Sequence, residues 1–158
     1  MALSTLQPAQ VVVTASGLTT SITAYTAGDM LGAELTVTGA AAASGGKGVL
    51  TSVMVQNSST NTTGALDMRL FNAASTPAAD NAANSWSDAN SRLQVIQYQC
   101  AAPVASALNQ SITAGNLWLD FLTAGSANLF LNVIALGAPA VFTAATDLQY
   151  TLNFLQWV

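Results

Sequence analysis

Charge and histidine are what this sequence most lacks. Its 158 residues include three basic residues, seven acidic residues and no histidine, so 6% of the chain is charged. An ordinary soluble domain carries about 25%. Without histidine, the chain has no Ser-His-Asp set, no Cys-His set and no His-containing metal site. With three basic residues and a net charge of −4, it also lacks the positive footprint that nucleic-acid binding requires. We expect no DNA or RNA partner.

Cysteine and long apolar runs are scarce as well. Cys100 is the single cysteine, which excludes an internal disulfide and a thiolate metal cluster. No cationic residue lies near it in the sequence, so we expect a small buried hydrophobe rather than a reactive thiol. A membrane-spanning helix needs about 20 apolar residues. The best run, Leu129 to Val141, is interrupted by Asn132, Gly137 and Pro139, so we expect no membrane partner.

The low charge bears on self-association. A compact monomer of this mass exposes on the order of 7,000 Å² of surface, which leaves about one charge for every 700 Å². A surface so weakly charged resists association poorly. We therefore expect that much of this surface is an interface between subunits.

What the chain does contain is a repeated two-residue alternation of apolar and polar side chains. Hydrophobic residues make up 51% of it. Alternation is the pattern of β-strands, and clusters of Gly, Ser, Asn and Pro separate the alternating segments as turns do. The segments are LGAELTVT (31–38), GVLTSVMVQ (48–56), LDMRLF (66–71), LQVIQY (93–98), NLWLDFL (116–122), NLFLNVIAL (128–136) and LQYTLNFLQW (148–157).

This pattern predicts an all-β fold. We expect one domain over residues 1–158, an antiparallel, jelly-roll-like β-sandwich of eight or nine strands. Residues 1–12 are predicted to form an N-terminal arm or an edge strand, and Ser87-Asp88 is predicted to cap a short helical turn in the long loop 72–91.

Segment 48–56 is apolar on both faces, which is typical of a central strand between two layers. Strict alternation places Val49, Thr51, Val53 and Val55 on one face and Leu50 and Met54 on the other.

The acidic residues offer little for catalysis. All seven are scattered through turns and strand faces, which favours solvated or interface carboxylates over a catalytic pair. We predict no catalytic residues, no cofactor and no enzymatic activity. The loop DNAANSWSDAN (80–90) supplies oxygen donors suited to calcium, with Asp80, Asp88 and Asn90 as candidate ligands. Its spacing matches no EF-hand, and Asx turns with a helix cap explain the same residues.

Three tryptophans remain. Trp86, Trp118 and Trp157 could stack on a sugar, although such residues are more often core or interface anchors. We take Trp118, Phe154 and Trp157 as interface candidates.

Three stretches in order resemble a known family: ITAYTAGDMLGAELTVTG (22–39), residues 44–93, and NVIALGAPAVFTAATDLQYTLNFLQ (132–156). They are similar to small virion proteins of tailed bacteriophages, of the capsid decoration or cement type. The most specific elements are YTAGD (25–29), LF (70–71), and DN (80–81) with SDA (87–89) in the following loop. The framework residues that carry the resemblance are Tyr25, Gly28, Asp29, Phe71, Asp80, Asn81 and Asp88.

The resemblance implies a β-sandwich subunit, often trimeric, on the outer surface of a capsid. Such proteins bind the major capsid protein where neighbouring copies meet and brace the head against packed DNA. The chain would then be made in the host cytoplasm and end in the virion. The alternatives are a phage tail-tube subunit and a tail or head-fibre module that binds host surface glycans.

Overall fold

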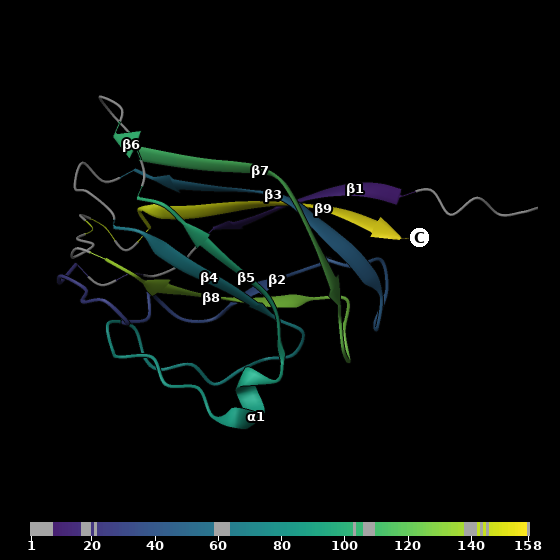
Figure 1. Cartoon of the computed structure of the whole chain (residues 1–158), viewed down its shortest axis with the longest axis horizontal. Coiled ribbons are helices and arrows are strands. Elements are labelled where there is room, and N and C mark those ends of the chain that lie inside the picture. Colours follow the sequence, from purple (N-terminus) through teal and green to yellow (C-terminus); the bar gives the residue numbers. More distant parts are fainter. Residues whose placement is uncertain are drawn as a thin grey trace, which may run out of the picture.

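The computed structural model describes residues 8–16, 20, 22–58, 64–102, 104–105, 110–137, 142, 144 and 146–157. These residues form an all-β sandwich with one short helix, as predicted (Figure 1). One sheet contains, in spatial order, β1 (Pro8–Ser16), β9 (Leu148–Trp157), β3 (Lys47–Asn57), β7 (Gln110–Leu122) and β6 (Val104–Ala105). The second contains β2 (Leu35–Val37), β8 (Leu129–Ala135), β4 (Leu66–Phe71) and β5 (Gln94–Cys100). The helix is α1 (Asp88–Ser91).

The strand pairing is nested. The first strand pairs with the last, β1 with β9, and the next pairs inward are β2 with β8, β3 with β7, and β4 with β5, all antiparallel. The two-residue β6 lies outside this scheme as an addition to the edge of β7. A long hairpin rolled into two facing sheets has this order, which is the jelly-roll arrangement. The predicted jelly-roll-like sandwich is therefore confirmed.

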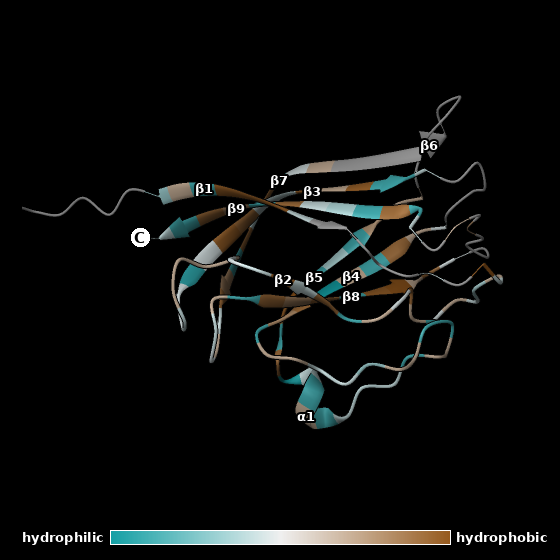
Figure 2. Cartoon of the chain, turned by 180° about the vertical axis from the view of Figure 1, so that it is seen from behind, coloured by the Kyte–Doolittle hydropathy of each residue, from teal (hydrophilic) through white to brown (hydrophobic). Residues whose placement is uncertain are grey.

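The apolar C-terminal third of the chain supplies two central strands. In β9 burial alternates along the strand, and the buried members are Leu148, Tyr150, Leu152, Phe154 and Gln156. Strand β8 is buried along nearly its whole length, and Figure 2 colours most of it as hydrophobic. Each of these strands has a neighbour on both sides, so its backbone groups are paired and its apolar side chains fill the core.

The predicted alternation in segment 48–56 is wrong in its first half. Leu50, Val53 and Val55 all belong to the core, a spacing of three and then two residues. The cause is a β-bulge, because Leu50 pairs with Phe154 and Ser52 pairs with Asn153, which leaves Thr51 as an extra residue. A bulge reverses the facing of every residue on one side of it.

Two long loops cover the outer face of the second sheet, and α1 lies within the second of them (Figure 1). Residues 28–31 run along β8: Gly28 N–H donates to Ala135 O, and Leu31 N–H donates to Val133 O. The chain then leaves β8 at Gly32, whose φ of 73° suits glycine, and returns to it as β2. The strand predicted over 31–38 is thus interrupted and short.

The N-terminal segment divides at Pro8. Residues 8–16 form the edge strand β1, paired with β9 from Pro8 opposite Trp157 to Ser16 opposite Gln149. The predicted edge strand is confirmed, while residues 1–7 of the predicted arm lie outside the described residues. Within the described part of the chain, no helix is long and apolar enough to cross a membrane.

Gly48 leaves room for the Phe121 ring of the neighbouring strand in the five-stranded sheet. A Cβ at this position would overlap the Phe121 ring and would lie 3.1 Å from Leu155 O. We predict that Gly48→Ala lowers the free energy of unfolding by about 1–3 kcal/mol, because overpacking forces neighbours off their rotamers. Gly125→Ala is the control, since nothing lies within 4 Å of its added Cβ. Chemical denaturation measures both, and equal stabilities of the two variants would contradict the prediction.

Candidate interaction surface

The two sheets differ in what lies over their outer faces. The second sheet is covered by the chain's own loops, whereas Figure 1 shows no described element on the far side of the five-stranded sheet. We call that outer surface the open face. Of the six large hydrophobic side chains that are exposed among the described residues, it carries four: Val12 (58% exposed), Trp118 (61%), Leu122 (48%) and Trp157 (46%).

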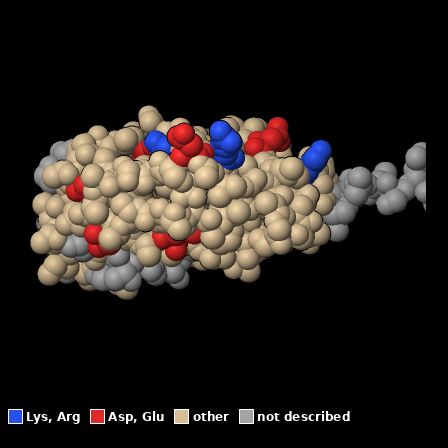
Figure 3. All heavy atoms as spheres, turned by 90° about the horizontal axis from the view of Figure 1, so that it is seen from below, with Lys and Arg blue, Asp and Glu red and all other residues tan. Residues whose placement is uncertain are grey.

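The open face is also nearly free of charge. The five strands of its sheet contain two charged residues, Lys47 and Asp120, and these lie on neighbouring strands near one end. Seven of the ten charged residues belong instead to the second sheet and its covering loops. Figure 3, which views the molecule from that loop side, shows basic and acidic side chains along one border and further acidic side chains over the rest of that side. The chain therefore presents a polar, loop-covered side and an apolar, neutral side.

Trp118 is held on the open face by a strained backbone. Between the pairs Leu50–Leu119 and Ser52–Gly115, strand β7 contains three residues, 116–118, opposite the single residue Thr51. Within this bulge Asn116 has φ 59° and Trp118 has φ 49°. Asparagine tolerates this left-handed region, but a bulky residue there is an outlier that costs about 1–3 kcal/mol. Residues in such conformations cluster at functional sites, which makes Trp118 the first candidate for a contact residue.

Side-chain hydrogen bonds fix the bulge from the neighbouring strands. Thr51 Oγ1 donates to Asn153 O at 3.0 Å, and Asn153 Nδ2 donates to Ser52 Oγ at 2.7 Å. On β7 itself, Leu117 and Leu119 pack against the core on either side of Trp118. Figure 1 shows β3 and β7 bending at mid-length. Contacts on β3, β7 and β9 together therefore hold Trp118 in its exposed position.

Five of the seven residues that carry the family resemblance converge where the two covering loops meet, while Phe71 ends β4 and Asp88 begins α1. Tyr25 is fully buried, and its hydroxyl donates to Asp80 Oδ1 at 2.6 Å. The same oxygen accepts the Gly32 N–H at 2.6 Å. Asn81, at φ 57°, donates through Nδ2 to Thr23 Oγ1 and through its backbone N–H to Met30 O. We call this contact between segments 23–32 and 80–84 the loop clamp.

Gly28 and Asp29 complete the loop clamp. The carboxylate of Asp29 accepts the backbone N–H and the hydroxyl of Thr26, both at 2.7 Å, which closes the turn at Gly28. Gly28 has φ 99°, a conformation that side-chain-bearing residues rarely adopt. Its carbonyl accepts the Asn84 N–H at 2.9 Å. These framework residues thus hold the loops together.

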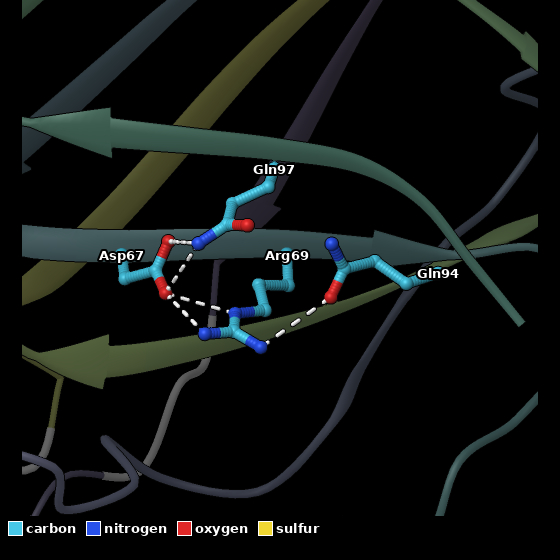
Figure 4. Close-up of polar contacts among 4 residues, drawn as sticks. All are labelled: Asp67, Arg69, Gln94 and Gln97. Carbon is cyan, nitrogen blue, oxygen red and sulfur yellow. Dashed lines mark hydrogen bonds and ion pairs between the residues drawn. The ribbon is translucent and has the colours of Figure 1, made fainter. Parts of the chain in front are cut away.

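A second cluster lies on the outer surface of β4 and β5 (Figure 4). Asp67 is buried and accepts from Arg69 Nε and Nη2, both at 2.8 Å, and from Gln97 Nε2 at 3.0 Å. Arg69 Nη1 donates to Gln94 Oε1 at 3.4 Å. The guanidinium also lies 4.5 Å from the Trp86 ring centroid, and that ring packs 5.3 Å from Phe71. Trp86 and Phe71 therefore fasten loop 72–91 to the sheet.

The structure places the three interface candidates differently. Trp118 and Trp157 are exposed, consistent with the prediction. Phe154 is wrong as an interface residue, because it is fully buried in the core and contacts Phe121 edge-on at 5.5 Å. The strand alternation decides this: Phe154 pairs with Leu50, which also faces the core, while Trp157 is three positions further and points outward.

The calcium candidates do not form a compact set of acids. Among the described residues, no three of Cys, Asp and Glu lie together in a way that could hold a metal ion. Asp80 is part of the loop clamp. Asp88 begins α1, where Ser87 is the N-cap and its Oγ accepts the Asn90 N–H at 3.2 Å. Asn90 Nδ2 donates to Thr76 Oγ1 at 2.6 Å. The predicted cap is confirmed, and Asp80 and Asn90 are both engaged in hydrogen bonds within the chain.

Cys100 is buried, as predicted, with its Sγ 3.6 Å from Met68 Sδ. Burial, reinforced by the nearby Asp67 carboxylate, raises the pKa of the thiol to about 11. At neutral pH the group is a protonated, weakly nucleophilic thiol inside the core.

No protein-family model matches this chain, and no curated protein matches it. Among solved structures, it is similar to a chain from the structure of a marine algae virus of the order Picornavirales. The two are 16% identical, the match covers 96% of this chain and 63% of that one, and the TM-score is 0.21. This chain thus spans less than two thirds of the other, and a TM-score this low carries no functional argument.

The loop clamp can be tested at Tyr25. We predict that Tyr25→Phe lowers the free energy of unfolding by about 1–3 kcal/mol, because it removes a buried hydrogen bond to a carboxylate. Tyr98→Phe is the matched control, since the Tyr98 hydroxyl makes no hydrogen bond within the described residues. Thermal denaturation compares the two variants. A Tyr25→Phe protein as stable as Tyr98→Phe would show that the loops are held by other contacts.

The strain at Trp118 predicts an unusual order of stabilities. Trp118→Gly and Trp118→Ala both remove the ring, but only glycine also relieves a positive φ. We expect the Gly variant to be more stable than the Ala variant by about 1 kcal/mol, the reverse of the order at ordinary strand positions. Denaturant titration of both proteins measures the difference. The ordinary order, with Ala more stable, would mean that position 118 is not strained.

Proposed function

We propose that the chain is a structural virion protein: a capsid decoration subunit that binds the outer face of a shell of major capsid protein and stabilises the head. The observation that carries the proposal is the open face, which is apolar, nearly uncharged and bears a tryptophan held outward by a strained bulge. The resemblance to capsid decoration proteins also supports it, and five of the seven residues that carry that resemblance build the loop clamp on the opposite side.

The open face has the chemistry of a docking surface. Interface cores are depleted of charge, and tryptophan is among the residues that contribute most to binding when it is truncated. The open face combines both properties, with Trp118, Trp157, Leu122 and Val12 exposed on a sheet that carries two charges. Since few charges take part, binding should depend weakly on ionic strength.

The mechanism follows from mass action. A subunit that binds the mature shell and not its alternatives stabilises that state by RT ln(1 + [L]/Kd), which is about 2.7 kcal/mol per site when the free concentration is 100 times Kd. A symmetric shell repeats the site many times, so a modest binding free energy at each site adds up to a large stabilisation of the whole shell. In this proposal the protein is made in the host cytoplasm and acts on the virion surface, as a homo-oligomer, with trimer the favoured state. It has no enzymatic role and no nucleic-acid or membrane partner.

Two alternatives remain as proposals, a tail-tube subunit and a tail or head-fibre module that binds host glycans. The second draws on one observation: Trp157 lines a pocket together with Asp120 and Lys47, the kind of aromatic and polar pairing that sugars use. Trp86 does not share that site, because its ring packs against Arg69 and Phe71.

Immunogold electron microscopy tests the proposed location. Antibody raised against the purified chain should label the heads of phage particles from the source evenly. Label confined to tails or tail tips would overturn the decoration role and favour one of the two alternatives. Particles without label, intact or disrupted, would overturn every virion assignment.

The docking role of the open face has its own test. We predict that Trp118→Ala weakens co-sedimentation with shells that lack the protein by about tenfold or more, because the ring is the best-exposed anchor of the open face. Ile22→Ala is the control, since Ile22 is 68% exposed but belongs to the loops on the other side. Equal losses of co-sedimentation in the two variants would show that the open face is not the surface that binds the shell.

A further inference from the structure

The edge strands of the two sheets differ in how they are protected against pairing with another chain. A sheet edge presents unpaired backbone N–H and C=O groups, and natural proteins protect such edges with short strands, charged residues, proline or a bulge. Three edge strands of this fold carry such a device. Strand β6 has two residues, β2 has three, and β5 contains a bulge at Val95.

The fourth edge strand, β1, lacks these devices. It is nine residues long, contains no charged residue, and pairs with β9 in one unbroken register from Pro8 to Ser16. Its proline stands at the first position, where a strand tolerates it. Among the described residues, no strand pairs with the side of β1 that faces away from β9. We call this side the β1 edge, and its backbone groups can accept another strand.

The sequence of β1 is chemically symmetric about its middle residue. It reads PAQVVVTAS, with Val12 at the centre. When an identical strand is laid antiparallel with Val12 opposite Val12, valine meets valine, glutamine meets threonine and alanine meets alanine. Pairs of β-branched residues stabilise adjacent strands, and no like charges face each other in this register. A strand of unrelated sequence would match this order only by chance, so the symmetry favours a second copy as the occupant.

We propose that two copies of this chain pair antiparallel along their β1 edges, with a two-fold axis at Val12. The contact is isologous, because each copy uses the same surface. A nine-residue antiparallel pair forms about eight backbone hydrogen bonds. Residues directly opposite each other have side chains on the same face of the sheet, so Val12 of both copies lies on the open face. The two five-stranded sheets then form one continuous sheet.

This pairing leaves the open face available to a shell. Hydrogen bonds between strands lie in the plane of the sheet, so the exposed side chains, Val12 and Trp118 among them, still point outward. Both open faces point in the same direction, and one shell can contact both. The inference goes beyond the proposed function, since it concerns how copies join each other. A trimer of this chain would need a further contact between copies.

Cysteine crosslinking tests the register. At the two-fold axis the two Cα atoms of residue 12 should lie about 4.5–5.5 Å apart, within the range that a disulfide spans. Under mild oxidation Val12→Cys should therefore form a covalent dimer, and so should a mixture of Gln10→Cys with Thr14→Cys. Gln10→Cys alone should not, because its two copies would lie about 13 Å apart along the strands. Ile22→Cys, at an exposed loop position, is the control for random collisions, and the native Cys100 is buried in every variant.

Mass in solution tests the pairing itself. By size-exclusion chromatography with light scattering, the full chain should be a dimer, or a hexamer where trimers also form. Val12→Lys should halve that mass, because it places two like charges at the axis, and Val12→Asp should do the same. A mixture of the Lys and Asp variants should restore the original mass, which also shows that both variants fold. Ile22→Lys, the control, should keep the original mass.

The outcomes that would overturn the proposal are distinct. They are a monomeric or trimeric full chain, a Val12→Lys protein of unchanged mass, a Lys–Asp mixture that stays dissociated, and crosslinking of Gln10→Cys alone as efficient as that of the mixture. A monomeric chain whose Val12→Cys variant crosslinks to the major capsid protein on shells would make the shell the occupant instead. The solution assays contain no shell, so the pairing can fail while the decoration role holds, and the reverse.

Discussion

The hydrogen bonds of the loop clamp decide which of the two sheets is covered by the chain's own loops. Asp80 accepts from Tyr25 and from Gly32, and residues 28–31 follow β8 as an additional strand segment. Together they lay two long loops over the second sheet, and Ile134 of β8 and Met30 of the covering loop, which form a β-bridge, are both buried. The five-stranded sheet receives no such cover from the described residues. The two sheets differ in cover because the loop clamp holds both long loops over the second sheet.

The distribution of charge has the same origin. Several acidic side chains accept hydrogen bonds from loops: Asp29 from Thr26, Glu34 from Ser75, and Asp147 from Ala144. A carboxylate that accepts backbone N–H groups is stabilised where it lies, so these charges hold loops in place instead of interacting only with water. On the rest of the surface, Ser, Thr, Asn and Gln supply the polar groups that interact with water. A protein built this way is poorly protected against association, which suits a subunit that works within an assembly.

The sequence predicted the parts of the fold that follow strict alternation. Strands β8 and β9, and the all-β sandwich they belong to, could be recognised from period-two patterns, and the short helix from Ser87-Asp88. The bulges could not, because an extra residue such as Thr51 has no signature in the alternation until its partner strands are known. Phe154, assigned to an interface, is different: the regular alternation along β9 places it on the core side with Leu148, Tyr150 and Leu152, so the sequence pattern already pointed to the core. The framework residues could be chosen by resemblance, but their meeting in space depends on contacts between positions some 50 residues apart, such as Tyr25 and Asp80.

The nested pairing of strands also bears on how the chain folds. Each pair encloses the next, so the sequence separation between partners grows from β4 with β5 to β1 with β9, and the entropic cost of closing each loop grows with it. Topologies dominated by such distant pairings fold slowly, in milliseconds to seconds. The pair β1–β9 closes last in this order, and it joins the first described residues of the chain to the last. The complete five-stranded sheet, and the face it presents, therefore exist only after β9 has been synthesised, because β9 lies between β1 and β3.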